Sequence, residues 1–109
     1  MAACTDILKF LDDYLDAPSI DDYCPNGLQV EGRKEIRKIV TGVTACQLLI
    51  DRAAELGADA LLVHHGIFWK GDDMRLVSMK RRRVGALISS DMSLIAYHLP
   101  LDMHPKIGN

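Results

Sequence analysis

The sequence lacks the patterns that mark several large classes of protein. It has no internal repeat and no low-complexity stretch, so it is not a repeat protein. No Gly-x-Gly-x-x-Gly or Walker A pattern occurs, which excludes the common nucleotide-cradling loops. No apolar run approaches the roughly 20 residues that span a bilayer, and no basic segment followed by an apolar stretch opens the chain. We therefore expect neither a signal peptide nor a membrane partner.

Cysteine is also scarce. The three cysteines, Cys4, Cys24 and Cys46, lie far apart and form no C-x-x-C pair. This spacing argues against a disulfide framework and against a structural zinc knuckle. It favours a reducing compartment, so we expect a cytoplasmic protein.

The charge balance gives little reason to expect a nucleic-acid partner. The 109 residues are 49% hydrophobic and 26% charged, with a formal net charge of −2, as in one soluble domain or part of one. The single basic run, residues 80–83 (Lys-Arg-Arg-Arg), is interpreted as the solvated first turns of a helix rather than as a phosphate or RNA patch.

Apolar periodicity predicts alternating helices and strands. Helices are expected over Thr5–Leu15, Ala45–Leu56 and Val77–Ser89, and strands over Ile36–Val43, Ala60–Val63 and Ser93–His98. The segment 19–32 is predicted to be a loop, with a short extended piece near Leu28 and Val30. Alternation of this kind predicts βαβ units with a mainly parallel sheet, which is the α/β class.

The ends and inner faces of two helices can also be predicted. Thr44 is placed as the cap of the second helix, and Gly57 as the glycine after its last turn. The buried stripes expected from the spacing are Leu48, Leu49, Ala53 and Leu56 in that helix and Met79, Val84, Leu87 and Ile88 in the next.

Histidines and one aspartate follow the predicted strands. His64 and His65 end the strand at 60–63, His98 ends the strand at 93–98, and Asp102 lies four residues further on. In parallel sheets the carboxyl ends of neighbouring strands share one rim, where ligands bind. Three imidazoles and a carboxylate suit zinc, iron or manganese. Asp102 has two oxygens and could bridge two ions.

Each of these residues also has a purely structural interpretation. Of the pair His64 and His65, one ring could be buried and the other exposed beside a turn, and His98 could be a satisfied core histidine. Asp102 could simply begin a turn. His104, before a proline, is expected in a loop rather than at a metal. The aromatic residues 68 and 69 could pack in the core or stack on a heterocycle.

Four stretches together resemble a known family. They are Tyr23–Gly32, Ile39–Ala45, Val63–Gly71 and His98–Pro105, which occur in the right order over nearly the whole chain. The family is GTP cyclohydrolase I type 2, also called NGG-one-interacting-factor-three-like, and it includes the bacterial YbgI-type proteins.

The resemblance implies an α/β fold of two similar lobes with two metal ions between them. It implies that His64 and His65 each ligate a metal and that Asp102 bridges both. His98 would line the same site in a supporting or proton-transfer role. The two divalent ions could be Zn, Fe or Mn. The resemblance further implies a toroidal homohexamer.

The family name implies hydrolytic opening of the GTP imidazole ring, with release of formate after attack by a metal-bound hydroxide. Family members are considerably longer, and their remaining ligands, a histidine and a glutamate, lie in the C-terminal part. Residues 1–109 then correspond to the N-terminal α/β lobe without the C-terminal lobe, and we expect a half-built site with weak metal affinity. The alternatives are a non-catalytic metal-binding scaffold that assembles into rings, or an inactive fragment.

Overall fold

The computed structural model describes residues 1–108 and places four strands in one sheet. The strand order is β2-β6-β5-β4, in which β4 pairs with β5 and β5 with β6 in parallel, while β2 runs antiparallel to β6. The strands are β2 (Gly27–Val30), β4 (Ile39–Thr41), β5 (Ala60–Val63) and β6 (Ser93–Ala96). The mainly parallel α/β sheet predicted from the sequence is confirmed.

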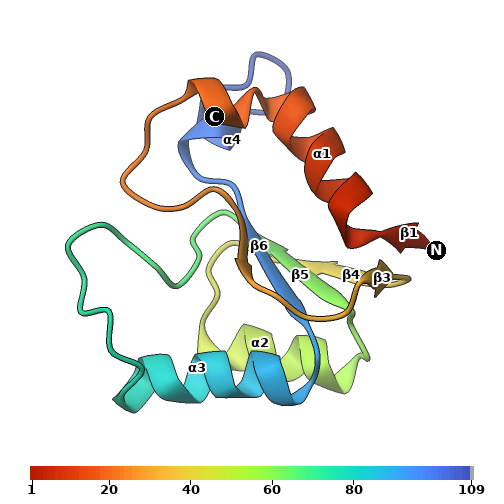
Figure 1. The fold of residues 1–109 in the computed structure, drawn as a ribbon, viewed down its shortest axis with the longest axis vertical. Coiled ribbons are helices and arrows are strands. Elements are labelled where there is room, and N and C mark those ends of the chain that lie inside the picture. The colour runs from red at the N-terminus through yellow and green to blue at the C-terminus, as the bar shows by residue number, and fades with distance from the viewer. Residues whose placement is uncertain (109) are drawn as a thin grey trace.

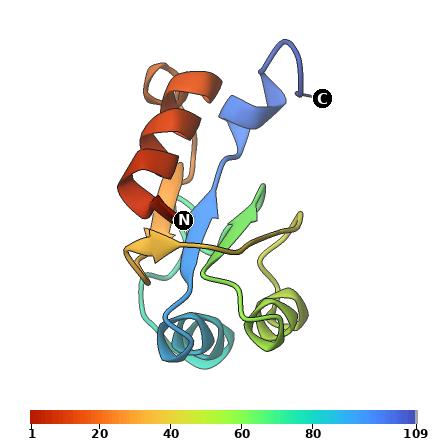
Figure 2. The same cartoon turned by 90° about the vertical axis from the view of Figure 1, so that its right-hand side faces the viewer.

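Helices cover the sheet from both sides (Figures 1 and 2). The helices α2 and α3 lie against one side, and α1 and α4 against the other. The helical segments are α1 (Cys4–Leu15), the 3-10 turn η1 (Ala17–Ser19), α2 (Gln47–Glu55), α3 (Ser78–Ser89) and α4 (Leu99–Asp102). A separate ribbon pairs β1 (Ala2–Ala3) with β3 (Glu35–Ile36).

Side chains alternate across the sheet, as the two-residue period of a strand requires. Leu61 and Leu94 point into the core beneath α2 and α3. Ala60 and Ile95 point into the second core, beneath α1. Strands buried on both faces read as continuous apolar runs, which explains why both runs were recognisable in the sequence.

The strand predicted over Ile36–Val43 is divided in the structure. Ile36 pairs with Ala2 in the small ribbon, whereas Ile39 begins β4 beside β5. Between them the backbone amides of Arg37 and Lys38 donate to Asp59 Oδ2 at 2.8 and 3.1 Å. Because these amides bond to a side chain rather than to a neighbouring strand, the predicted strand is interrupted here. Its first part, β3, pairs with β1, and its second part, β4, pairs with β5. The extended piece predicted near Leu28 is the edge strand β2.

The predicted inner stripes of two helices are partly wrong. Leu48 is 80% exposed and Leu56 is 42% exposed, while Ile50 and Ala53 are the buried residues of α2. At 3.6 residues per turn, Leu48 lies roughly 200° from Ile50 and faces the opposite way. In α3 the predicted Val84 and Leu87 are buried, but Met79 and Ile88 are exposed.

The two ends of α2 differ in how well the sequence predicted them. Thr44 is not its cap, because the helix begins after Cys46 and Thr44 instead forms a bridge with His65. At the other end Gly57 has a φ of 73°. The amides of Gly57 and Ala58 donate to the carbonyls of Ala54 and Ala53, which is the Schellman ending expected of a helix-terminal glycine.

Within residues 1–108, none of the helices combines the length and the apolar character that a bilayer crossing demands.

Candidate metal centre

The carboxyl ends of β5 and β6 lie side by side and position the histidines. The strands are in register to Val63 and Ala96, and the amide of Tyr97 donates to the carbonyl of Val63 at 3.0 Å. Just beyond β5 the amides of His64 and His65 both donate to the carbonyl of Val43, at 3.1 and 2.8 Å. The backbone of the pair is therefore fixed by the segment between β4 and α2.

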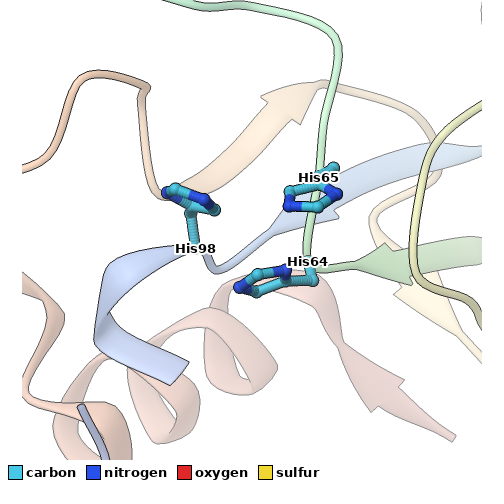
Figure 3. A group of neighbouring side chains, drawn as sticks. All are labelled: His64, His65 and His98. Carbon is cyan, nitrogen blue, oxygen red and sulfur yellow. The ribbon is translucent and has the colours of Figure 1, made fainter. Parts of the chain in front are cut away.

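Three imidazoles converge at this rim (Figure 3). The ring centroids of His64 and His65 are 4.4 Å apart, and His98 lies 4.8 Å from the first and 5.4 Å from the second. Each ring offers a nitrogen within 4.8 Å of the other two. The shared rim predicted from the sequence thus brings these three residues together. We call them the histidine cluster.

Asp102 joins the histidine cluster through α4. Pro100 occupies the start of this one-turn helix, and the amide of Asp102 donates to the carbonyl of His98 at 3.2 Å. The turn brings Asp102 Oδ1 to 2.9 Å from His64 Nε2. That nitrogen is buried and has no hydrogen bond among the described residues, although the carboxylate stands close by.

This geometry fits a shared divalent ion. A buried polar atom without a hydrogen bond is destabilising unless something else satisfies it. Ligand atoms about 2.0–2.2 Å from one ion stand about 2.8–3.6 Å from each other, from octahedral to tetrahedral angles, and the 2.9 Å between His64 Nε2 and Asp102 Oδ1 lies within that range. Imidazole and carboxylate are also a donor set that Zn, Fe and Mn accept.

His65 has the electrostatic properties of a neutral ligand. Burial, and then the adjacent rings of His64 and His98, lower its pKa. Neutral imidazole is the form that binds metals. The Thr44 hydroxyl lies 3.2 Å from His65 Nδ1 and so orients the ring.

His98 is held by a carboxylate from a distant loop. The residue is only 6% exposed, and its Nδ1 lies 3.2 Å from Asp22 Oδ1. Asp22 Oδ2 accepts the amide of Leu99 at 2.8 Å, while the amide of His98 donates to Asn26 Oδ1, also at 2.8 Å. Hydrogen bonds to this loop therefore fix both the ring and the backbone of His98.

The charge on Asp22 sets the tautomer of His98. Burial acts to raise the pKa of Asp22, but the hydrogen bonds from Leu99, Asn26 and His98 outweigh it, and the net pKa is lowered. An ionised Asp22 can only accept a hydrogen bond, so Nδ1 of His98 carries the proton and donates to it. The other ring nitrogen, Nε2, is then left with its lone pair.

Asp22, Cys24 and His98 form a second group with ligand atoms within 4.8 Å. Burial, and then the charge of Asp22, raise the pKa of Cys24 to about 11. Without a metal the thiol therefore keeps its proton at neutral pH, and a metal that binds there has to displace it. The histidine cluster is the better candidate of the two.

Sequence reasoning missed Asp22 and Asn26. Both lie in a stretch of turn-forming residues, and 76 positions separate Asp22 from His98. No periodicity links residues so far apart. The only available signal was that Asn26 belongs to one of the four motifs. His104 lies in a loop as expected, where it stacks on Tyr14 at 4.5 Å.

Comparison with known proteins places this site in context. The family profile described as Duf34/NIF3 (NGG1p interacting factor 3) matches residues 2–109. A Pseudomonas aeruginosa protein named "GTP cyclohydrolase 1 type 2 homolog" is 58% identical over 107 residues, which are 98% of this chain and 42% of the relative. The Escherichia coli K12 protein of the same name is 51% identical over 105 residues, with 96% and 42% covered.

Solved structures agree with these matches. A structure described as "protein ybgI, unknown function" superimposes with a TM-score of 0.97 at 50% identity, over 98% of this chain and 43% of the other. A protein from Thermus thermophilus gives a TM-score of 0.91 at 37% identity, over 98% and 44%. The chain therefore spans somewhat less than half the length of the relatives that it matches.

Proposed function

Because this chain belongs to the Duf34/NIF3 family, as its four motifs indicated, we propose that it supplies one side of the metal centre of a hydrolase. In this proposal His64 and His65 each bind one of two divalent ions, and Asp102 bridges them. The observation that supports it most strongly is His64 Nε2, which is buried without a hydrogen bond 2.9 Å from Asp102. The ions are Zn, Fe or Mn, in keeping with the donor atoms.

The proposed reaction is hydrolytic opening of a purine ring. Its basis is the name of the relatives, "GTP cyclohydrolase 1 type 2 homolog". A divalent ion supplies water that ionises near neutral pH. His98 is the proposed proton carrier, because Asp22 engages its Nδ1 and leaves Nε2 to accept a proton or return it.

The proposal includes a contribution from outside this segment. The chain corresponds to 42% of the length of its curated relatives. We propose that the remaining part of such a protein supplies further ligands on the opposite side of the ions. Residues 1–109 alone would then bind metal weakly, because two imidazoles and one carboxylate do not enclose two ions.

The test compares two histidine variants. His64→Ala removes a proposed ligand, whereas His104→Ala removes a histidine that stacks on Tyr14 outside the site. After dialysis against Zn, Fe or Mn, plasma emission spectroscopy should find metal in the wild type and in His104→Ala, but at least tenfold less in His64→Ala. Equal metal content in the two variants would overturn the proposed ligand set. Formate release from GTP by a metal-loaded protein that contains both this segment and the remaining part tests the reaction itself.

A second candidate is a metal-binding scaffold that assembles into rings. Large apolar side chains, among them Phe10 (64% exposed) and Val43 (67% exposed), surround an open cavity and favour self-association. We therefore propose a homo-oligomer whichever candidate holds. Light scattering should find an assembly that the double variant Phe10→Lys/Val43→Lys weakens. A wild-type monomer at working concentration would contradict this part. An assembly that contains both this segment and the remaining part, and that binds metal but releases no formate, would favour the scaffold.

A further inference from the structure

A pocket of about 630 Å³ opens beside the histidine cluster, and the proposed ligands account for none of its walls. One wall is the loop that contains Tyr23 and Pro25. The other is the segment after β5, with Phe68, Trp69 and Lys70. In Figure 1 these loops lie on the same side of the molecule, between α4 and the start of α3.

Hydrogen bonds between the two loops build the pocket. The amide of Lys70 donates to the carbonyl of Tyr23 at 2.7 Å. The side chain of Gln29 joins the walls a second time, since it accepts the amide of Ile67 and donates to the carbonyl of Pro25, both at 2.9 Å. The shape of the pocket therefore does not depend on a ligand.

Gly66 makes room for this bridge. A Cβ at this position would overlap the amide group of Gln29, so any larger residue would displace the side chain that joins the two loops. The glycine after the histidine pair thus serves the pocket as well as the turn.

The pocket presents aromatic rings next to the histidine cluster. Tyr23 and Trp69 have ring centroids 5.7 Å apart, tilted by 33°. Each meets the ring of His98 at 5.1 Å, and Trp69 lies 6.0 Å from His65. Tyr23 remains 53% exposed. A half-open aromatic pair of this kind can stack on a planar ring, as aromatic residues do with nucleobases.

Two ammonium groups at the pocket can meet an anion. Lys70 and Lys80 line it together with Asp22 and Asp72, and Lys80 Nζ also donates to the carbonyl of Asp73 and lies 5.4 Å from the ring centroid of Phe68. The oxygens of Asp22 are already bonded to Leu99 and His98. The first turn of α3, which lies wholly within the described residues, contains Lys80 and has neither an acidic residue nor a side-chain cap. The positive end of the helix dipole is thus left unneutralised.

We propose that Tyr23 and Trp69 stack on the base of a purine nucleotide, with its phosphates directed to Lys70 and Lys80. The choice of a purine nucleotide rests on the proposed function. The aromatic pair then determines which substrate reaches the histidine cluster, and it binds the base whether or not metal is bound.

Trp69 provides the measurement, because it is the only tryptophan in the chain. Its fluorescence is followed while metal-free protein is titrated with GTP, guanosine or tripolyphosphate. GTP and guanosine should quench it, GTP at the lower concentration, and tripolyphosphate should not. Tyr23→Leu should weaken GTP binding about tenfold, the effect of losing one stacking contact. Lys70→Gln should weaken the binding of GTP but leave that of guanosine unchanged.

The control is Tyr14→Leu, which changes a tyrosine of similar exposure on α1 that does not line this pocket. It should bind GTP as the wild type does. Equal affinity in the Tyr23 and Tyr14 variants, or an absence of quenching by guanosine, would overturn the proposal. Circular dichroism melts identify any variant that fails to fold, in which case Tyr23→Phe, which keeps the ring, should bind GTP normally.

Two further outcomes separate this inference from the proposed function. Quenching that persists in His64→Ala, together with no formate from a metal-loaded protein that contains both this segment and the remaining part, would support the base-binding pocket and contradict the hydrolase. Formate release that Tyr23→Leu leaves unchanged would support the hydrolase and overturn the pocket.

Discussion

The two faces of the sheet differ in how completely they are covered. Beneath α2 and α3 the side chains of Ile50, Leu61 and Leu94 are fully buried. On the other face α1 packs on β2 and on the end of β6, where Asp12 accepts the hydroxyl of Tyr97 at 2.7 Å. Between α1 and the strands β4 and β5 a cavity of about 440 Å³ remains open.

The open cavity reaches the histidine cluster. Its lining is almost wholly apolar, from Phe10 and Leu62 to Ile107, and it includes His64. The face beneath α2 and α3, which we call the closed face, thus holds the strands in place. The face beneath α1, the open face, contributes His64 to the histidine cluster and leaves apolar side chains exposed around the cavity. The difference suggests that stability and function are divided between the two faces.

The largest expected effect is a change in the free energy of unfolding, and it compares the two faces at neighbouring residues of one strand. Leu61 and Leu62 are neighbours in β5 that point to the closed and the open face. Leu61→Ala should lower the free energy of unfolding by about 2–5 kcal/mol, as large-to-small changes in a filled core do. Leu62→Ala should lower it by less than half as much, because this side chain already borders a cavity. Urea denaturation measures both, and equal losses would show that the faces do not differ.

The next effect concerns the loop that holds His98. Asp22→Asn keeps the shape of the side chain but removes the charge that fixes the His98 tautomer. We expect a loss of about 10- to 100-fold in metal affinity or activity, the usual result of changing the partner of a histidine at a metal site. The nitrogen chemical shifts of His98 should show the ring proton on Nδ1 in the wild type and divided between Nδ1 and Nε2 in the variant.

Asp21→Asn is the control for this change, since Asp21 is the exposed neighbour in the same loop. It should leave both the affinity and the shifts unchanged. A wild-type His98 that is protonated at Nε2 would contradict the role given to Asp22.

A smaller effect is expected at the end of β5 that lies away from the histidine cluster. The pKa of Asp59 is lowered, first by the amide of Arg37 and then by that of Lys38 and the charge of Arg33. Because the pKa of Asp59 is lower in the folded than in the unfolded protein, the ionised carboxylate stabilises the fold at pH values above the usual carboxyl pKa of about 3.9. This stabilisation is lost as the pH falls through the lower folded value.

Asp59→Asn should therefore cost about 1–2 kcal/mol at pH 7, and the difference from the wild type should shrink as the pH falls below about 4. Asp13→Asn, which changes an exposed partner of Lys9, should cost much less. A difference between Asp59→Asn and the wild type that does not change with pH would show that the charge of Asp59 is not responsible. Metal binding should be the same in all three proteins.

The smallest effect is expected at the rim itself. His64→Leu replaces a buried nitrogen that lacks a hydrogen bond. In the metal-free protein the change should leave the free energy of unfolding within about 1 kcal/mol of the wild type, or raise it, because a functional group is retained at some expense of stability. Metal binding should be lost. Thermal melts with and without metal measure both quantities, and a large destabilisation without metal would identify His64 as a structural residue.

The sequence predicted those features that depend on local pattern and strand adjacency. Two apolar runs that alternate with helices place His64, His65 and His98 at one rim, and the structure brings them together there. The proline after His98 likewise accounts for the short turn that returns Asp102 to His64.

The features that the sequence did not predict depend on contacts between distant segments. Asp22 reaches His98 across 76 positions, and Leu28 joins the sheet by pairing with β6. Neither contact has a periodic signal. Leu48 was placed on the wrong face because an apolar residue can be exposed on an uncovered surface.

X-ray absorption of the zinc-loaded protein tests the central claim, that the histidine cluster with Asp102 is the metal site. We expect nitrogen and oxygen ligands at about 2.0–2.2 Å with imidazole scattering from at least two histidines, and no sulfur. A sulfur ligand at about 2.3 Å would place the metal at Cys24 instead. A shell without imidazole scattering would contradict the site altogether.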